Sequence, residues 1–196
     1  MACVLSYIAA YPLALVIHVL AASLLIGGSL ILPIAHRALL RAETNRDLGL
    51  WLGFMRDATR WHPIAALVLL LTGAFMGARG HFWTDGWFIV AALGWLANAG
   101  LANRFLNGSM ATLGRALAAS RGETITADVD ALRRTPAFTH ADDAIRAIDV
   151  ALLYLMFNKP TFSESLAVVV FAVVMAAALR LALTARATRP EATVTL

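Results

Sequence analysis

Five histidines are the residues of this sequence whose side chains are best suited to chemistry. Imidazole is the commonest metal ligand in proteins, and it titrates near neutral pH. The sequence has a single cysteine, Cys3, and it lacks a nucleotide-binding loop, a nucleophile–histidine–aspartate order and paired carboxylates. Metal or redox chemistry therefore has to be sought at the histidines, which are His18, His36, His62, His81 and His140.

His18 lies about ten residues into the first apolar stretch, far from both of its ends. An ionisable side chain at that depth in a membrane is a functional candidate, because it is costly to bury without a partner. Small residues share its face on a helical wheel: Ala14, Ala21, Ala22, Gly28 and Ser29. Such a face admits either a flat cofactor such as a porphyrin or a neighbouring helix, and the residues alone leave both open.

His62 and Lys159 are the other two candidate cofactor-binding residues. His62 precedes Pro63 at the start of the second apolar stretch, and it can approach His18 if its helix begins near Leu48. Lys159 is the only lysine in the chain and is predicted at the end of the fourth helix. We expect interfacial positions for His36 and His140 and a solvated loop for His81. The methionines are dispersed, so they do not indicate a thioether path for Cu(I).

Transmembrane helices are the elements that must position these residues. Of 196 residues, 60% are apolar and 14% are charged, whereas soluble domains contain about 25% charged residues. This excludes a disordered chain, a disulfide scaffold and an ordinary soluble enzyme. Four stretches can cross about 30 Å of hydrocarbon, and a fifth is shorter. The prediction is an all-α, polytopic membrane helix bundle with spans at about 8–36, 61–78, 86–105, 142–158 and 163–185.

The basic residues predict the topology of the bundle. Fourteen of the 16 fall on one side if 142–158 crosses the membrane, and only Arg79 and Lys159 fall on the other. The positive-inside rule then predicts five crossings, with the N-terminus outside and the C-terminus inside. The net charge of +4 is therefore a topology signal, and we expect no nucleic-acid partner. Residues 1–190 are expected to form one domain, with a cytoplasmic loop at 106–139 and a tail at 191–196.

Two capping boxes refine the predicted ends of the last two helices. Thr139 followed by Asp142 predicts a helix that begins at His140, and Thr161 followed by Glu164 predicts the start of the last helix. In each pair the hydroxyl residue and the acidic residue cap each other's backbone N–H groups.

Three short motifs, in this order and spacing, resemble the copper resistance protein D family and the related HemJ-type protoporphyrinogen oxidases. The motifs are His18 through Gly27-Gly28 to Leu32-Pro33, Trp61-His62-Pro63 followed by Thr72-Gly73, and Leu155-Met156-Phe157-Asn158-Lys159-Pro160. The resemblance covers most of residues 10–160. It implies a helix bundle that, in the HemJ branch, holds haem b. On that resemblance His18 is the axial ligand and Lys159 the matching lysine.

We therefore expect a multi-pass protein of a bacterial-type inner membrane that binds haem b and acts in electron transfer or haem-dependent oxidation, as a membrane oxidoreductase. His18, His62 and Lys159 are the expected cofactor-binding residues, with His18 and His62 as metal ligands. The expected partners are the lipid bilayer, a redox partner or quinone, and a second copy of the chain in a homo-oligomer. The alternatives are a protein of copper uptake or handling, with copper as the bound metal, and a structural membrane subunit without a cofactor.

Overall fold

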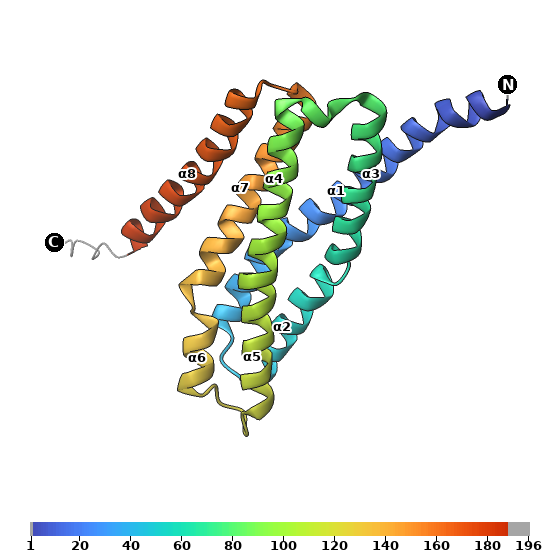
Figure 1. Cartoon of the computed structure of the whole chain (residues 1–196). Helices are drawn as coiled ribbons and strands as arrows, with labels where there is room; N and C mark the ends of the chain where they lie inside the picture. Colours follow the sequence, from blue (N-terminus) through green and yellow to red (C-terminus); the bar gives the residue numbers. More distant parts are fainter. Residues whose placement is uncertain (1, 188–196) are drawn as a thin grey trace, which may run out of the picture.

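The computed structural model describes residues 2–187, and the side chains of residues 10–185. The predicted tail at 191–196 lies outside the described residues. Within residues 2–187 the chain is almost entirely helical and contains no β-strand (Figure 1). The elements are α1 (Ala2–Arg41), α2 (Asn45–Thr59), α3 (His62–Gly80), the 3₁₀ turn η1 (Phe82–Thr84), α4 (Gly86–Leu101), the π-helical segment η2 (Ala102–Asn107), α5 (Gly108–Ala119), α6 (Ala127–Arg133), α7 (Pro136–Asn158) and α8 (Phe162–Ala187).

The bundle is arranged around α4 and α7, which stand side by side (Figure 1). α8 packs along α7 and α4 on one side, and α1 crosses the bundle and packs against α3 on the other. η1 joins α3 to α4. The two helices touch mainly near the ends that η1 joins, where Gly77 meets Phe88. The space between α1, α3, α4 and α7 is therefore not closed by direct α3–α4 packing.

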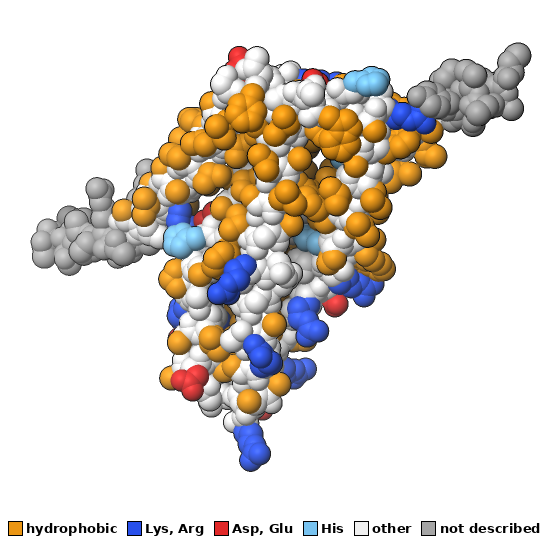
Figure 2. All heavy atoms as spheres, in the orientation of Figure 1, with side chains coloured by type: hydrophobic (Ala, Val, Ile, Leu, Met, Phe, Trp, Pro, Cys, Tyr) orange, Lys and Arg blue, Asp and Glu red, His pale blue; other side chains and the backbone are white. Residues whose placement is uncertain are grey.

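Four of the five expected membrane spans are confirmed as helices of membrane length, and the fifth, 142–158, which lies in α7, is not among them. Within residues 10–185, four helical stretches are long and apolar enough to cross a membrane: Ala10–Arg41, Asn45–Gly80, Gly86–Ala119 and Phe162–Ala185. Apolar side chains cover most of the upper body of the molecule, and the arginines gather toward its lower end (Figure 2). This distribution is that of a multi-pass protein in contact with lipid, because hydrocarbon excludes unpaired charges.

The start of α7 differs from the prediction. The helix begins at Pro136, and Thr139 lies inside it, so the Thr139–Asp142 capping box is wrong. Proline is favoured in the first turn of a helix, because its missing N–H has no helical partner there. The second box is confirmed: the backbone N–H and the hydroxyl of Thr161 both donate to the Glu164 carboxylate at the start of α8.

The segment 106–139, expected as a loop with short helices, is mostly helical and well packed. η2 continues α4 into α5, and α6 lies beside α5. Arg133 is buried and donates to the carbonyl groups of Leu39 and Ala42 at 3.1 and 2.7 Å. Hydrogen bonds from Arg134 and Arg133 lower the pKa of Asp130, so this carboxylate stays ionised beside them. The end of α1 is thus held by α6, because Arg133 satisfies carbonyl groups that a helix end leaves free.

Candidate functional site

A cavity of about 500 Å³ lies between α1, α3, α4 and α7. His18 and His62 both line it, and most of its wall is apolar. Its other polar lining residues are Ser29, Thr59, Asn98, Asn103, Asn107, Asp142 and Asp149. Cavities of this size, with apolar walls and a few polar groups, are typical of small-molecule and cofactor sites.

The protonation of His18 follows from its hydrogen bonds. Its Nδ1 lies 2.9 Å from the Thr72 hydroxyl on α3, and that hydroxyl donates to the Val68 carbonyl group at 2.7 Å. The Nδ1–H tautomer of His18 lets both contacts form together, because the Thr72 hydroxyl can then donate its single proton to Val68 and accept from His18. The neutral ring then carries its free lone pair on Nε2, which is the atom available to a metal.

The two cavity histidines are accommodated by glycines of the opposite helix. The His18 ring lies against Gly73 of α3, where a Cβ would be 3.3 Å from the His18 Cε1 atom. The His62 ring lies against Gly28 of α1 so closely that a Cβ there would overlap its Nε2 atom. The small-residue face of α1 therefore serves helix packing and at the same time leaves room for an imidazole.

These contacts also place the two histidines at different depths. α1 and α3 are antiparallel, with His18 at the level of Gly73 and His62 at the level of Gly28. His18 and Gly28 are ten residues apart, which corresponds to about 15 Å along a helix. Metal–nitrogen bonds are only about 2 Å long. The cavity therefore brings both residues to one wall but not to one metal ion. The buried Nε2 atom of His62 has no hydrogen-bond partner among the described residues.

Lys159 lies away from this cavity. It follows α7 in the left-handed conformation, with φ of 47°. Its Nζ atom is 5.0 Å from the ring centre of Phe82 and 5.6 Å from that of Trp87. These are cation–π distances, so the aromatic rings of η1 and α4 hold the ammonium group at the end of the bundle where η1 lies. The structure does not bring Lys159 together with His18.

The remaining histidines have other surroundings. His36 is buried and packs against Phe138 in a tilted arrangement, with ring centroids 4.5 Å apart. His81 ends α3 in the left-handed conformation, with φ of 56°, and its backbone N–H donates to Gly77. His140 is exposed on α7. None of the three lines the central cavity.

Asn98 and Asp149 form a polar pair on the cavity wall that the sequence reasoning missed as a site. The Asn98 amide donates to an Asp149 carboxylate oxygen at 2.6 Å, and the buried Asn98 Oδ1 atom has no partner among the described residues. The other charges of α7 are paired: Arg146 with Asp142 and Asp143, and Asp143 also with Arg180. An aspartate inside a predicted span was the available signal.

Met156 is a second residue that the sequence reasoning missed. It lines the cavity from α7 and packs against the cluster that contains Val90 and Ala91. Phe88 of α4 touches Gly77 of α3, so these two residues lie at the same level. Ala91 is three residues further from η1 than Phe88. Gly73, which His18 touches, is four residues further from η1 than Gly77. Met156 and His18 therefore lie at similar depths on different walls, and a thioether is a known axial ligand of haem iron.

The described residues fit haem better than a compact metal site. Within residues 10–185 no three His, Cys, Asp or Glu side chains lie close enough together to hold a metal ion. Haem needs only one or two axial ligands and an apolar pocket for its ring, which His18, Met156 and the cavity wall offer. No lysine or arginine is among the residues that line the cavity, and its side-chain amide donors are those of Asn98, Asn103 and Asn107.

Comparisons with protein-family models, with curated proteins and with solved structures find no match to this chain.

Proposed function

We propose that this chain is an integral inner-membrane protein that binds haem b through the Nε2 atom of His18 and acts in electron transfer or haem-dependent oxidation. The observation that carries the proposal is the chain of hydrogen bonds from His18 Nδ1 through Thr72 to the Val68 carbonyl group. Histidines that ligate metals usually donate their other ring N–H in this way, which fixes the tautomer and orients the ring.

The cavity residues have distinct roles in this proposal. His18 would hold the haem iron through its Nε2 atom, and Met156 would be the candidate second ligand from the other wall of the cavity. Gly73 and Ala91 keep the walls near His18 flat enough for a planar group. Bound haem supplies one-electron chemistry, tuned by its axial ligands and by burial. Asp149, held by Asn98, is the carboxylate on the wall that can exchange a proton with a molecule in the cavity.

The openness of the cavity between α3 and α4 supports a membrane-dissolved redox partner. Leu70 of α3 and Leu96 of α4 line the cavity, yet they are 45% and 57% exposed on the lipid-facing surface. A small apolar molecule can therefore enter from the hydrocarbon without crossing water. A quinone has this character, and it is the partner class that the proposal names.

The first test of the proposed function is an absorption spectrum of the purified protein, oxidised and reduced, from cells supplied with ample haem. We expect a Soret band at stoichiometric haem, and a copper assay on the same sample should find no stoichiometric copper. Stoichiometric copper without a Soret band would replace the haem proposal by copper handling. The absence of both would favour a structural subunit.

The proposal includes five crossings, with the N-terminus outside and the C-terminus inside. α7 has 23 residues, or about 35 Å of helix, which is enough for the hydrocarbon core. The charged residues at its inner end form ion pairs within α7 and with Arg180 of α8. These pairs lower the free-energy cost of placing the charges near the membrane.

Reporter fusions test this topology. A reporter at the C-terminus should be cytoplasmic, and one inserted near Gly80 should be periplasmic, because the arginines cluster on the opposite side from Gly80. A periplasmic C-terminus would mean that α7 does not cross the membrane.

A further inference from the structure

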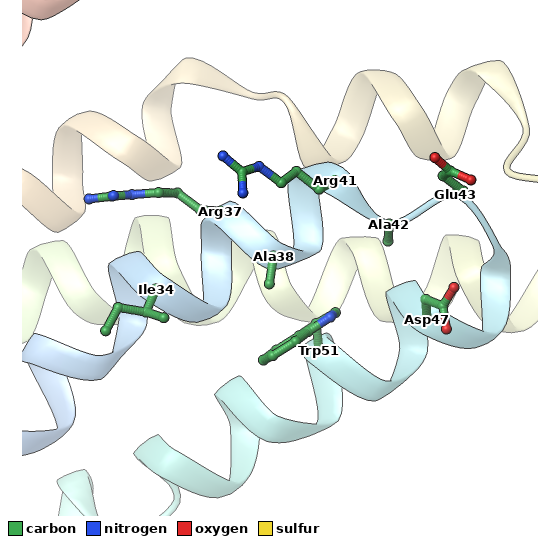
Figure 3. Close-up of a pocket in the computed structure, with 8 residues that line it drawn as sticks. All are labelled: Ile34, Arg37, Ala38, Arg41, Ala42, Glu43, Asp47 and Trp51. Atoms are coloured by element: carbon green, nitrogen blue, oxygen red, sulfur yellow. The ribbon is translucent and has the colours of Figure 1, made fainter.

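A second cavity, of about 590 Å³, lies on the surface where the end of α1 meets the start of α2 (Figure 3). The residues that matter for its chemistry are Ile34, Arg37, Arg41, Glu43, Asp47 and Trp51. We call it the α1–α2 groove. It is separate from the central cavity, with which it shares no lining residue.

Charges follow a fixed order along the α1–α2 groove. Ile34, which is 67% exposed, stands at one end, and Arg37 and Arg41 follow at a spacing of one helical turn. Glu43 and Asp47 stand at the other end. Both guanidinium groups extend toward the Ile34 end and away from the two carboxylates (Figure 3). The arginines therefore lie toward the Ile34 end of the groove, and the carboxylates lie at its other end.

The arginines of the groove are free to bind an external anion. Among the described residues, neither Arg37 nor Arg41 forms an ion pair. Asp47 accepts a hydrogen bond from the Thr44 hydroxyl through one oxygen, and no hydrogen bond is formed by its other oxygen within the described part of the chain. The charged groups of the groove therefore do not pair with one another.

The groove lies beyond the inner end of α3, on the side where the proposed topology has the inner headgroups. α3 has 19 residues, so about 28 Å separate its outer end from His62, close to the thickness of the hydrocarbon core. His62 lies beside Gly28, and Arg37 is nine residues further along α1, at most about 13 Å deeper. Trp51 and Trp61 are 37% and 49% exposed near this level, as expected of interfacial aromatic residues.

We propose that the α1–α2 groove binds the headgroup of a phospholipid that carries a primary ammonium group, of the phosphatidylethanolamine type. The acyl chains run along Ile34, the phosphate is bound by Arg37 and Arg41, and the ammonium group is bound by Glu43 and Asp47. In such a lipid the phosphate lies next to the acyl region and the ammonium lies further out. This is the order of the charges in the groove.

The charge balance of the groove separates this lipid from other phospholipids. Two arginines and two carboxylates make the groove neutral overall, which matches a zwitterionic headgroup. A phosphatidylglycerol headgroup leaves both carboxylates without a cation. A phosphatidylcholine headgroup is zwitterionic, but its quaternary ammonium cannot donate hydrogen bonds to them.

Native mass spectrometry of the full-length protein with defined phosphatidylethanolamine, phosphatidylglycerol and phosphatidylcholine tests the proposal. The unmodified protein should retain phosphatidylethanolamine roughly tenfold more tightly than either other lipid, the size of one charge-assisted contact. R37A/R41A should lose this retention. The control variant R115A/R121A removes the same charge from exposed positions on and after α5, and this variant should still retain phosphatidylethanolamine.

The variant E43Q/D47N distinguishes the ordered groove from ordinary interfacial arginines. Asparagine at position 47 can still accept from the Thr44 hydroxyl, so the start of α2 is preserved. Once the carboxylates are neutral, the groove should prefer phosphatidylglycerol over phosphatidylethanolamine. The proposal is wrong if the unmodified protein prefers phosphatidylglycerol, or if E43Q/D47N leaves the ratio of the two lipids unchanged. Thermal unfolding of each variant checks that it is folded.

Discussion

The variant His18→Ala is expected to lose the Soret band of the haem-loaded protein or to shift it strongly. His18 lines the central cavity, and its Nδ1–H is committed to Thr72, so the ligand atom Nε2 disappears with the ring. Loss of an axial bond changes the electronic state of haem iron or releases the haem. The measurement is the absorption spectrum and the haem content of protein purified under identical conditions.

Companion variants show whether His18 acts as a ligand or only as a packing residue. Thr72→Val keeps the shape of the side chain but removes the hydroxyl group that contacts the His18 Nδ1 atom, and haem affinity should fall about 10- to 100-fold. Met156→Leu should turn a low-spin spectrum high-spin if Met156 is the second ligand. His140→Ala, at an exposed position on α7, should leave the spectrum unchanged.

The opposite result for the two cavity histidines would place the haem site at His62 and not at His18. His62 is about 15 Å deeper than His18 along α1 and cannot share its iron. If His18→Ala keeps a normal Soret band while His62→Ala loses it, the haem is bound at the inner level, and the proposed ligand is wrong.

The variant Gly86→Ala is expected to destabilise the bundle, although it adds only a single methyl group. A Cβ at Gly86 would lie 2.5 Å from the backbone nitrogen and Cα atoms of Phe162. A side chain can rotate out of such a contact, but the backbone at the start of α8 cannot, so α4 and α8 must move apart. Overpacking of this kind costs about 1–3 kcal/mol in the free energy of unfolding, and occasionally more.

Gly100→Ala is the matched control for this prediction. Gly100 lies in the same helix, α4, and a Cβ there would meet no atom within 4 Å. Alanine favours a helix over glycine by about 1 kcal/mol, so this variant should be as stable as the unmodified protein or slightly more stable. Thermal unfolding in detergent measures both. Equal melting temperatures for the two variants would contradict the close approach of α4 and α8 at Gly86.

Features that depend on a few neighbouring residues were predictable. The four long apolar stretches are membrane-length helices in the structure, because crossing hydrocarbon requires about 20 apolar residues with all backbone groups paired locally. The capping box of Thr161 and Glu164 was also predictable, since its partners are three residues apart. His18 was identified as a candidate because depth within an apolar stretch can be read from the sequence.

Helix ends in the polar segments were less predictable, because distant residues decide them. α1 continues to Arg41 and ends at carbonyl groups that Arg133 binds, and this arginine is more than 90 residues away in the sequence. The Thr139–Asp142 pair has the pattern of a cap, yet Pro136 starts α7 earlier. Local patterns compete at such positions, and tertiary contacts determine which of them is used.

The apolar stretches were thus enough to predict a multi-pass helical protein and to show which histidine lies deepest in its first helix. The surroundings of that histidine depend on how the helices pack. The antiparallel register of α1 and α3 pairs His18 with Thr72, 54 residues away, and separates it in depth from His62. The rings of Phe82 and Trp87 hold Lys159 at the end of the bundle where η1 lies, away from the cavity. The physical reason is that apolar length selects each helix independently, whereas the register between helices is set by side-chain packing and by polar partners that are distant in the sequence.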